Sequence, residues 1–200
     1  MKPTDFVLVQ AKLGAASVPS LAQAFASVVS QSVLPLALRR VAWSAELQTV
    51  YGYAKLPART ELSALALQLL AQAFQIAIPA AQDIRLSRLQ AAMDLQGHSY
   101  AQFPVFHYVV EMDPEDGWMP EISRWYDTEH MPGLAAVPGT IRATRLLNHD
   151  YGPLSLACYD LVSTETLGSA PWLAVRGTAW SDITRPHFTN TKRSMFTVIA

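Results

Sequence analysis

The sequence has few charged residues. Only 16% of its 200 residues are Asp, Glu, Lys or Arg, whereas 50% are hydrophobic, and the formal net charge is −1. A chain of this composition can bury enough apolar surface to fold, so it is not a disordered protein. It also has no basic stripe of the kind that binds nucleic acid. The scarcity of charge predicts extensive buried surface, either within the chain or between subunits, and we expect a homodimer.

Cysteine is nearly absent. The single Cys158 excludes an intrachain disulfide and is typical of a protein of the reducing cytoplasm. It lies in the apolar run Leu154–Leu161, which indicates a buried strand, so we interpret it as a small buried hydrophobic residue and not as a nucleophile. Residues 1–17 have no uninterrupted apolar stretch and therefore do not resemble a secretory signal.

One uncharged segment, Leu62–Ala81, has the length of a membrane span. Gln68, Gln72 and Gln75 nevertheless form a polar stripe along one helical face of this segment. Such a stripe is typical of an amphipathic surface helix, so we expect no membrane partner.

Three common kinds of site have no motif in the chain. It contains no closely spaced His, Cys and carboxylate set, no Gly-rich phosphate loop and no Gly-x-Ser-x-Gly turn. We therefore expect neither metal, nor nucleotide, nor acyl-serine chemistry.

Strand-like and helix-like segments occur in the same order in both halves of the chain. In the first half we expect strands at Phe6–Val9, Val41–Ser44, Leu47–Lys55 and Ile84–Ala91, with helices between Leu21 and Pro35 and from Thr60 to Pro79, and Pro57 ending the third strand. In the second half we expect strands at Val105–Met112, Thr140–Leu147, Leu154–Val162 and Lys192–Ile199, a helix from Gly117 to Met131, and two short helical pieces capped by Thr164 and Ser169.

This repeated order predicts an α+β fold of two tandem ferredoxin-like βαββαβ units, at residues 1–100 and 101–200. Each antiparallel sheet would carry its helices on one face and leave an apolar second face, which in the later unit contains Val105 and Val109. Packing the two bare faces together would give a pseudo-dimeric α/β barrel with its helices outside.

A short motif of the second half resembles a known family. The stretch Trp125–Pro132 reads WYDTEHMP, and Val137–Thr140 reads VPGT. This pattern of an aromatic pair, a histidine, a proline and a Pro-Gly turn resembles the EthD-like branch of the dimeric α/β-barrel superfamily. The first half resembles a degenerate copy, by element order alone. The resemblance implies a ferredoxin-like fold with paired sheets, in a superfamily of small monooxygenases, polyketide cyclases, decarboxylase-like enzymes and haem proteins.

His130 is the first candidate catalytic residue. It lies just before Pro132, at the predicted end of a helix. In one interpretation its imidazole points into a pocket between helix and sheet and acts as a general base toward an acidic carbon or a phenol. In the other it is partly cationic and contacts the free carbonyl groups at the helix end. The residues alone leave both interpretations open.

Aromatic residues are concentrated around this histidine. A pocket lined by indole and phenyl rings suits a flat apolar molecule such as a polyketide, quinone or catechol derivative. Packing in the core is the alternative role for the same rings. The candidate substrate-binding aromatic residues are Trp125, Tyr126, Tyr159, Trp172 and Trp180.

Two further polar residues are candidates. His107 lies in the middle of a predicted strand and is either a core residue or the partner of His130 in an acid–base pair. Arg185 lies in the segment Trp180–Phe188 and either holds a carboxylate or a developing oxyanion, or pairs with Asp182.

Three functions remain open at this point. The first is a cofactor-independent enzyme that acts on a small aromatic, polyketide-like or quinone-like molecule with a histidine general base. The second is a non-catalytic binding or oligomerising protein whose pocket is filled by its own side chains. Haem binding through a histidine of the second half is a third alternative, implied by fused two-unit relatives in the superfamily. The expected partner is a small apolar or aromatic ligand.

Overall fold

The computed structural model describes residues 1–200, which divide into two units. Unit 1 contains Met1–Ala91, Asn148–Tyr151 and Phe196–Ala200, and unit 2 contains Ala92–Leu147 and Gly152–Met195. Each unit is built around an antiparallel sheet with helices on one face. The predicted α+β class is therefore confirmed.

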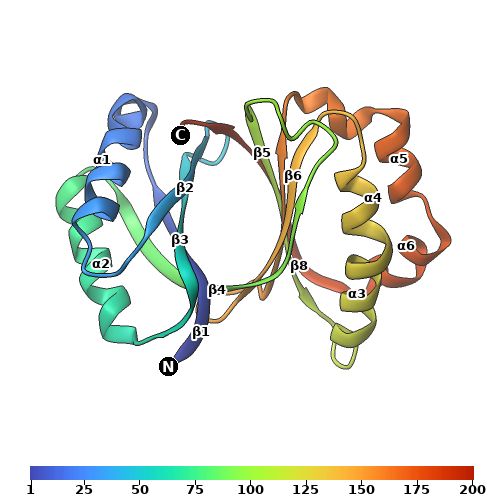
Figure 1. The fold of residues 1–200 in the computed structure, drawn as a ribbon, viewed down its shortest axis with the longest axis horizontal. Coiled ribbons are helices and arrows are strands. Elements are labelled where there is room, and N and C mark those ends of the chain that lie inside the picture. The colour runs from blue at the N-terminus through green and yellow to red at the C-terminus, as the bar shows by residue number, and fades with distance from the viewer. The chain divides into compact units, whose positions relative to one another are not determined.

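Unit 1 follows the predicted order of strands and helices. Its elements are β1 (Lys2–Lys12), α1 (Val18–Gln31), β2 (Ala37–Ser44), β3 (Thr49–Leu62), α2 (Ala64–Ala77) and β4 (Gln82–Gln96), of which β4 continues into unit 2. The strands lie side by side in the order β2–β3–β1–β4, and every neighbouring pair is antiparallel. Figure 1 shows α1 and α2 together on one face of this sheet.

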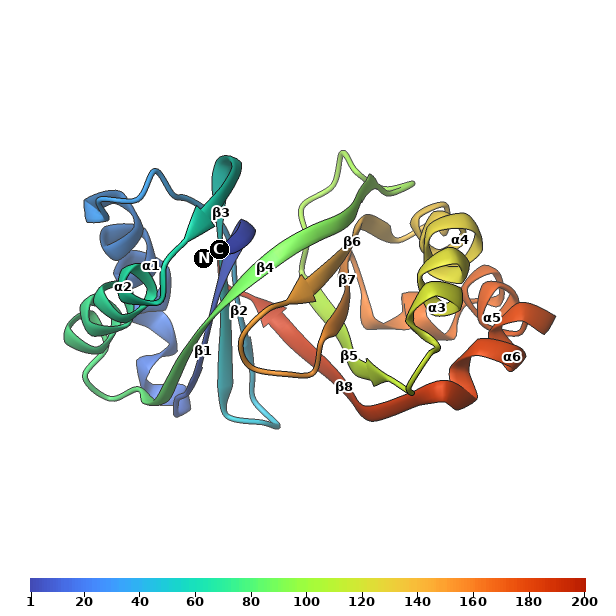
Figure 2. The ribbon, with the colours of Figure 1, turned by 90° about the horizontal axis from the view of Figure 1, so that it is seen from below.

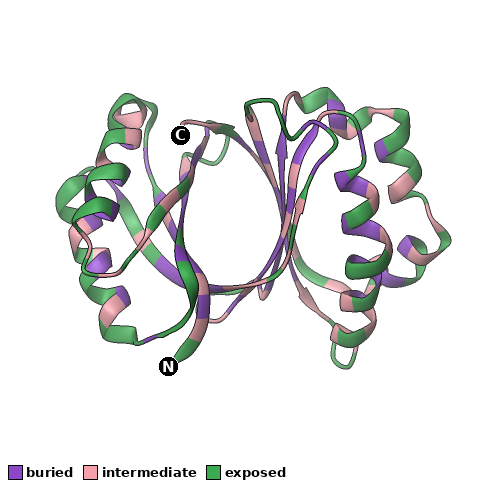
Figure 3. Cartoon of the chain, viewed as in Figure 1, coloured by how far each residue is buried: buried purple, intermediate pink, exposed green.

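The core of unit 1 lies between these helices and the sheet. The helix sides that face the sheet are buried and their outer sides are exposed (Figure 3). Phe25 of α1 and Phe74 of α2 pack in a tilted arrangement with their ring centroids 4.7 Å apart. A Cβ atom at Gly52 in β3 would lie 2.0 Å from the Phe25 ring, so only glycine lets this ring rest against the sheet.

Two boundaries in unit 1 differ from the predicted ones. Strand β3 continues past Pro57, because this proline lies where the register between β1 and β3 shifts and no ladder hydrogen bond needs its missing N–H group. Thr60 consequently lies in β3 and does not cap a helix. Ser63 caps α2 instead, and its side chain accepts a hydrogen bond from the backbone N–H of Ala66 at 3.2 Å.

Unit 2 has a comparable sheet with more helical segments on it. Its elements are β5 (Phe106–Pro114), α3 (Met119–Trp125), a π-helical turn (Tyr126–His130), α4 (Met131–Ala135), β6 (Thr140–Asn148), β7 (Ser155–Leu161), α5 (Ala170–Arg176), α6 (Ala179–Thr184) and β8 (Phe188–Val198), with 3-10 turns at Thr164–Gly168 and Arg185–His187. The strand order is β8–β5–β7–β6. Figure 2 shows α3, α4, α5 and α6 on one face of this sheet.

The first helix of unit 2 is longer than predicted. It passes from α3 through the π-helical turn into α4 and ends at Ala135, not at Met131. Pro132 does not end it, because this proline occupies the first turn of α4, where its missing N–H group is tolerated. The predicted Pro-Gly turn before β6 is present, and Gly139 adopts a φ of +98°, which favours glycine.

Two further predictions in unit 2, the cap of α5 and the buried strand around Cys158, are confirmed. Ser169 caps α5 and Gly177 ends it, whereas Ser163 takes the capping place that was predicted for Thr164. Cys158 is buried in β7 and is not bonded to another cysteine. None of the helices combines the length and the apolar character that are needed to cross a membrane.

Candidate functional site

A small cavity lies between the helices and the sheet of unit 2. Its volume is about 30 Å³, close to the volume that one water molecule occupies in the liquid. Apart from Val110 and Leu134, the lining consists of six aromatic residues, one histidine and three arginines. These are Tyr108, Trp125, Tyr126, Tyr159, Trp172 and Phe188, with His130, and Arg176, Arg185 and Arg193.

The π-helical turn places three of these side chains. In this turn the backbone N–H of Met131 donates to the carbonyl of Tyr126, five residues earlier, and the helix gains an additional residue relative to an α-helical turn. Trp125, Tyr126 and His130 lie in or next to the turn and all line the cavity. π-Helical turns are frequently found at functional sites.

His130 is enclosed by aromatic rings. Its imidazole stacks on the indole of Trp125, with ring centroids 4.1 Å apart, and meets the edge of the Tyr126 ring at 5.7 Å. The side chain is only 8% exposed, and its Nδ1 atom has no hydrogen-bond partner. Burial, together with the charges of Arg185 and Arg176, lowers the pKa of His130 to about 3. The imidazole is therefore neutral at physiological pH, and it is not a cationic residue at the end of a helix.

Three arginines reach the same cavity from different elements. Arg176 is the last residue of α5, Arg185 follows α6, and Arg193 lies in β8. Arg185 donates from Nη1 to the carbonyl of Arg176 at 3.2 Å. Burial and the charges of Arg176 and Arg193 lower the pKa of Arg185. The alternative in which Arg185 pairs with Asp182 is wrong, because the structure has no ion pair between them.

The tyrosines of the wall are protonated groups. The hydroxyl of Tyr159 is buried and donates to the sulfur of Met131 at 3.2 Å, and burial raises its pKa well above the ordinary value. Burial also raises the pKa of Tyr126 and of Tyr108. These phenols can donate hydrogen bonds but are not bases.

A buried arginine, paired with a partly exposed carboxylate, supports the wall of the cavity. The guanidinium of Arg145 lies 4.9 Å from the centre of the Tyr126 ring and forms an ion pair with Asp127 at 3.1 Å. It also donates to the hydroxyl of Ser123 at 2.9 Å. Arg145 thus fixes Tyr126 and is not free to bind a ligand.

The structure brings together most of the residues that were predicted from the sequence. His130, Trp125, Tyr126, Tyr159, Trp172 and Arg185 all line the cavity. Their roles remain predictions.

Two predicted residues lie elsewhere. His107 alternates with Tyr108 along β5, so it points to the opposite face of the sheet, and its Nδ1 lies 2.8 Å from Oδ1 of Asp160. It therefore does not form a pair with His130. Trp180 turns toward α3, where its indole N–H donates to Glu121 at 2.8 Å and its ring contacts Arg124.

Sequence reasoning missed Tyr108, Arg176 and Arg193. Strand alternation could have predicted Tyr108. Neighbouring residues of a strand point to opposite faces of the sheet, so a face that does not contain His107 contains Tyr108. No comparable signal exists for the two arginines, since they are distant in sequence from His130 and only the folded chain brings them to the cavity.

Comparison with known proteins shows the fold of the chain. No protein-family model matches the sequence, and no curated protein is detectably similar to it. A provisionally assigned monooxygenase from Lactobacillus acidophilus is 11% identical, with a TM-score of 0.68 over 100% of this chain and 95% of its own. An anthrone oxidase-like protein is 11% identical, with a TM-score of 0.65 over 100% of this chain and 93% of its own.

A third similar structure is a variant of chlorite dismutase from Candidatus Nitrospira defluvii. It is 11% identical, with a TM-score of 0.64 over 98% of this chain and 92% of its own. The chain therefore has the dimeric α/β-barrel fold that the short motif implied. At this level of identity the likeness concerns the fold alone and does not extend to a reaction.

The residues around the cavity do not fit haem in this conformation. His130 offers a neutral buried imidazole, which is a suitable ligand for iron. The space beside it, about 30 Å³, is however far below the roughly 300 Å³ of a small ligand pocket. A porphyrin would displace several of the buried rings.

Proposed function

We propose that unit 2 is a cofactor-independent enzyme that acts on a small, flat aromatic molecule of the polyketide or quinone type, with His130 as the proton acceptor. One observation carries this proposal: a buried, neutral imidazole with an unpartnered Nδ1 borders a cavity whose walls are aromatic. The fold neighbour described as anthrone oxidase-like is consistent with it, because anthrones are flat aromatic ketones.

The chemistry that this arrangement favours is proton abstraction. A neutral imidazole can accept a proton from a phenol or from a carbon next to a carbonyl group. A pKa of about 3 makes His130 by itself a weak base. The arginines that lower this pKa also stabilise an anion on the ligand, so they make the bound ligand more acidic. Once the anion forms next to His130, its charge favours the imidazolium and assists the transfer.

Admission of a substrate requires the cavity to widen. The large rings of Trp125 and Trp172 are fully buried, whereas Arg176 and Arg185 are half-buried and Arg193 is exposed. The arginines therefore form the solvent side of the cavity. Movement of their long side chains would open the site while the aromatic walls stay in place.

The small volume of the cavity favours a second candidate function, that of a binding protein without catalysis. Most of the space next to His130 is filled by the protein's own rings. Such a protein would bind the same aromatic ligand without transferring its proton.

One experiment separates the two functions. Anthrone has an acidic CH₂ group whose exchange with deuterium from the solvent can be followed by NMR. The proposed enzyme accelerates this exchange, and His130→Ala abolishes the acceleration while tryptophan fluorescence still reports binding. His98→Ala, which removes an exposed histidine, is the matched control and should exchange like the wild type. Equal exchange in wild type and His130→Ala would contradict the proposal, and binding without exchange would support the binding protein.

Haem is tested separately. A Soret band that appears on addition of haem and is lost in His130→Ala would replace the cofactor-independent enzyme with a haem protein.

A further inference from the structure

The arginines of unit 2 fall into two groups. One group consists of residues that are each held by a carboxylate: Arg124 by Glu121, Arg142 by Asp94 and Arg145 by Asp127. Arg176, Arg185 and Arg193 form the other group, and none of them has an ion-pair partner. All three members of this second group line the cavity next to His130. Apart from the exposed Lys192, the uncompensated positive charge of the unit is therefore concentrated at one place.

This concentration of like charge is unfavourable by itself. Like charges in a partly buried setting repel one another more strongly than they would in water. The consequence is visible at Arg185, whose pKa is lowered by burial and by the charges of Arg176 and Arg193. Asp182 opposes this shift only through space, and its effect is smaller than the effects of burial and of the two arginine charges. A bound anion would offset the repulsion that remains.

The cavity wall also contains polar atoms that need a partner. Nε1 of Trp125 and Nδ1 of His130 are both buried and make no hydrogen bond. An indole N–H can only donate, and it suits an anionic oxygen. A neutral imidazole nitrogen can accept a proton from a hydroxyl group. A ligand with both kinds of oxygen would satisfy both atoms.

We infer that the ligand of this cavity is an aromatic molecule with an anionic oxygen group, a carboxylate or an ionised phenol, which Arg176, Arg185 and Arg193 bind while the rings of Trp125 and Trp172 hold its flat body. This inference rests on the proposed function in taking the cavity as the ligand site. It adds the charge of the ligand, and it assigns a binding role to two residues, Arg176 and Arg193, that sequence reasoning did not identify.

Matched probes test the charge of the ligand. 2-Naphthoate and 2-naphthamide share one aromatic body and differ mainly in charge, and quenching of tryptophan fluorescence measures the binding of both. We expect naphthoate to bind about tenfold more tightly than naphthamide, as charge-assisted hydrogen bonds require. This preference should weaken as salt screens the arginines.

Substitutions then locate the preference. Arg193→Gln and Arg185→Gln should each reduce the preference for naphthoate, and Arg193 is exposed, so its replacement leaves the fold intact. Arg124→Gln, in the same unit but outside the cavity, should leave the preference unchanged. 2-Naphthol completes the set, because the absorbance of the bound form reports whether the site also stabilises an ionised phenol.

The outcomes separate this inference from the proposed function. If naphthamide binds as tightly as naphthoate and both are displaced by anthrone, the aromatic site stands and the anion site is wrong. A preference for naphthoate that survives both cavity substitutions would also overturn the anion site. Failure of every probe, anthrone included, to quench tryptophan fluorescence would overturn the proposed function itself.

Discussion

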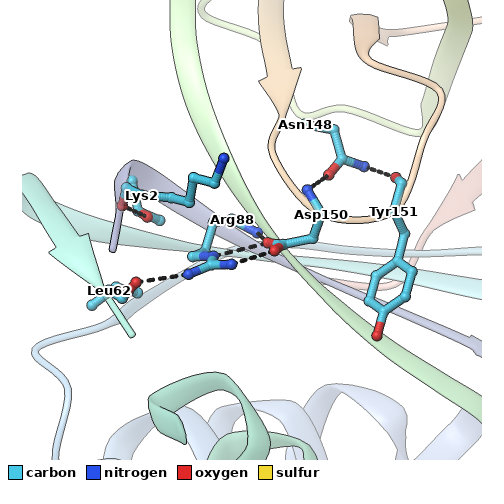
Figure 4. A network of polar contacts seen from close by, with 7 residues as sticks. Lys2, Leu62, Arg88, Asn148, Asp150 and Tyr151 are labelled. Carbon is cyan, nitrogen blue, oxygen red and sulfur yellow. Dashed lines mark hydrogen bonds and ion pairs between the residues drawn. The ribbon is translucent and has the colours of Figure 1, made fainter. Parts of the chain in front are cut away.

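The carboxylate of Asp150 binds both the side chain and the backbone of Arg88. Nε of Arg88 donates to Oδ2 at 2.9 Å, its backbone N–H donates to the same oxygen at 2.8 Å, and its Nη2 pairs with Oδ1. The remaining terminal nitrogen donates to the carbonyl of Leu62 at 2.8 Å (Figure 4). This network ties Asn148–Tyr151, the part of the β6–β7 connection that belongs to unit 1, to the end of β3 and the middle of β4.

Removal of the Asp150 charge should destabilise the protein. Asp150→Asn leaves the mostly buried guanidinium of Arg88 without its counter-charge. We expect a loss of about 2–3 kcal/mol in the free energy of unfolding, between the values for exposed and fully buried pairs. Urea unfolding measures it. Arg124→Gln breaks an exposed pair and should cost less than about 1 kcal/mol. Equal losses in the two variants would show that the Arg88–Asp150 network is not a structural element.

The pair of Arg88 and Asp150 also predicts that the free energy of unfolding falls at acidic pH. Although burial favours the protonated form of Asp150, the hydrogen bonds and the charge of Arg88 lower its pKa below the ordinary value. A lowered carboxyl pKa contributes stability above the unfolded pKa, near 3.9, and this stability is lost as the pH falls through the folded pKa. The free energy of unfolding of the wild type should therefore fall below about pH 4 by more than that of Asp150→Asn. Parallel pH profiles would contradict this.

Sequence patterns predicted the fold better than they predicted its boundaries. A continuous run of β-branched and aromatic residues, Phe6–Val9, identified β1, and apolar residues at helical spacing identified α1. The two errors at prolines have a common cause. Pro57 and Pro132 look like ends of elements in the sequence, yet each lies where its missing N–H group is not needed, at a shift of register and in a first helical turn. Such a context exists only after strands have paired or a π-helical turn has formed.

The candidate site was predicted in part for a similar reason. His130 and its aromatic neighbours form one short motif, and they also meet in space. Arg176 and Arg193 come from α5 and β8, and no local pattern unites them with His130. His107 was a candidate partner of His130 in an acid–base pair, but strand alternation turns it to the other face of the sheet. The homodimer and the cytoplasmic location remain predictions.

The buried imidazole of His130 should make the free energy of unfolding depend on pH in the range below about 6.5 as well. In the unfolded chain this histidine is protonated below about pH 6.5, whereas in the folded protein it stays neutral down to about 3. The unfolded state therefore binds more protons in this range, and stability falls as the pH is lowered from 6.5, by up to ~1.4 kcal/mol per pH unit. His130→Phe has no titrating group and should lose this dependence. NMR should show no change of the His130 ring signals between pH 8 and 5, and a titration in that range would mean that the imidazole is exposed to water.

The contact between Gly52 and Phe25 predicts a strong steric effect in unit 1. A methyl group at Gly52 would lie 2.0, 2.7 and 2.8 Å from three atoms of the Phe25 ring, which is itself packed against Phe74 and cannot move aside freely. Gly52→Ala should therefore cost at least ~2 kcal/mol of stability, as overpacking of a core does. Gly168→Ala, where the added atom has nothing within 4 Å, is the matched control and should change the free energy of unfolding little. Phe25→Leu provides space for the methyl group. The double variant Gly52→Ala/Phe25→Leu should therefore lose less free energy of unfolding than the two single variants lose together. Additive losses in urea unfolding would show that the Phe25 ring is not what requires glycine at position 52.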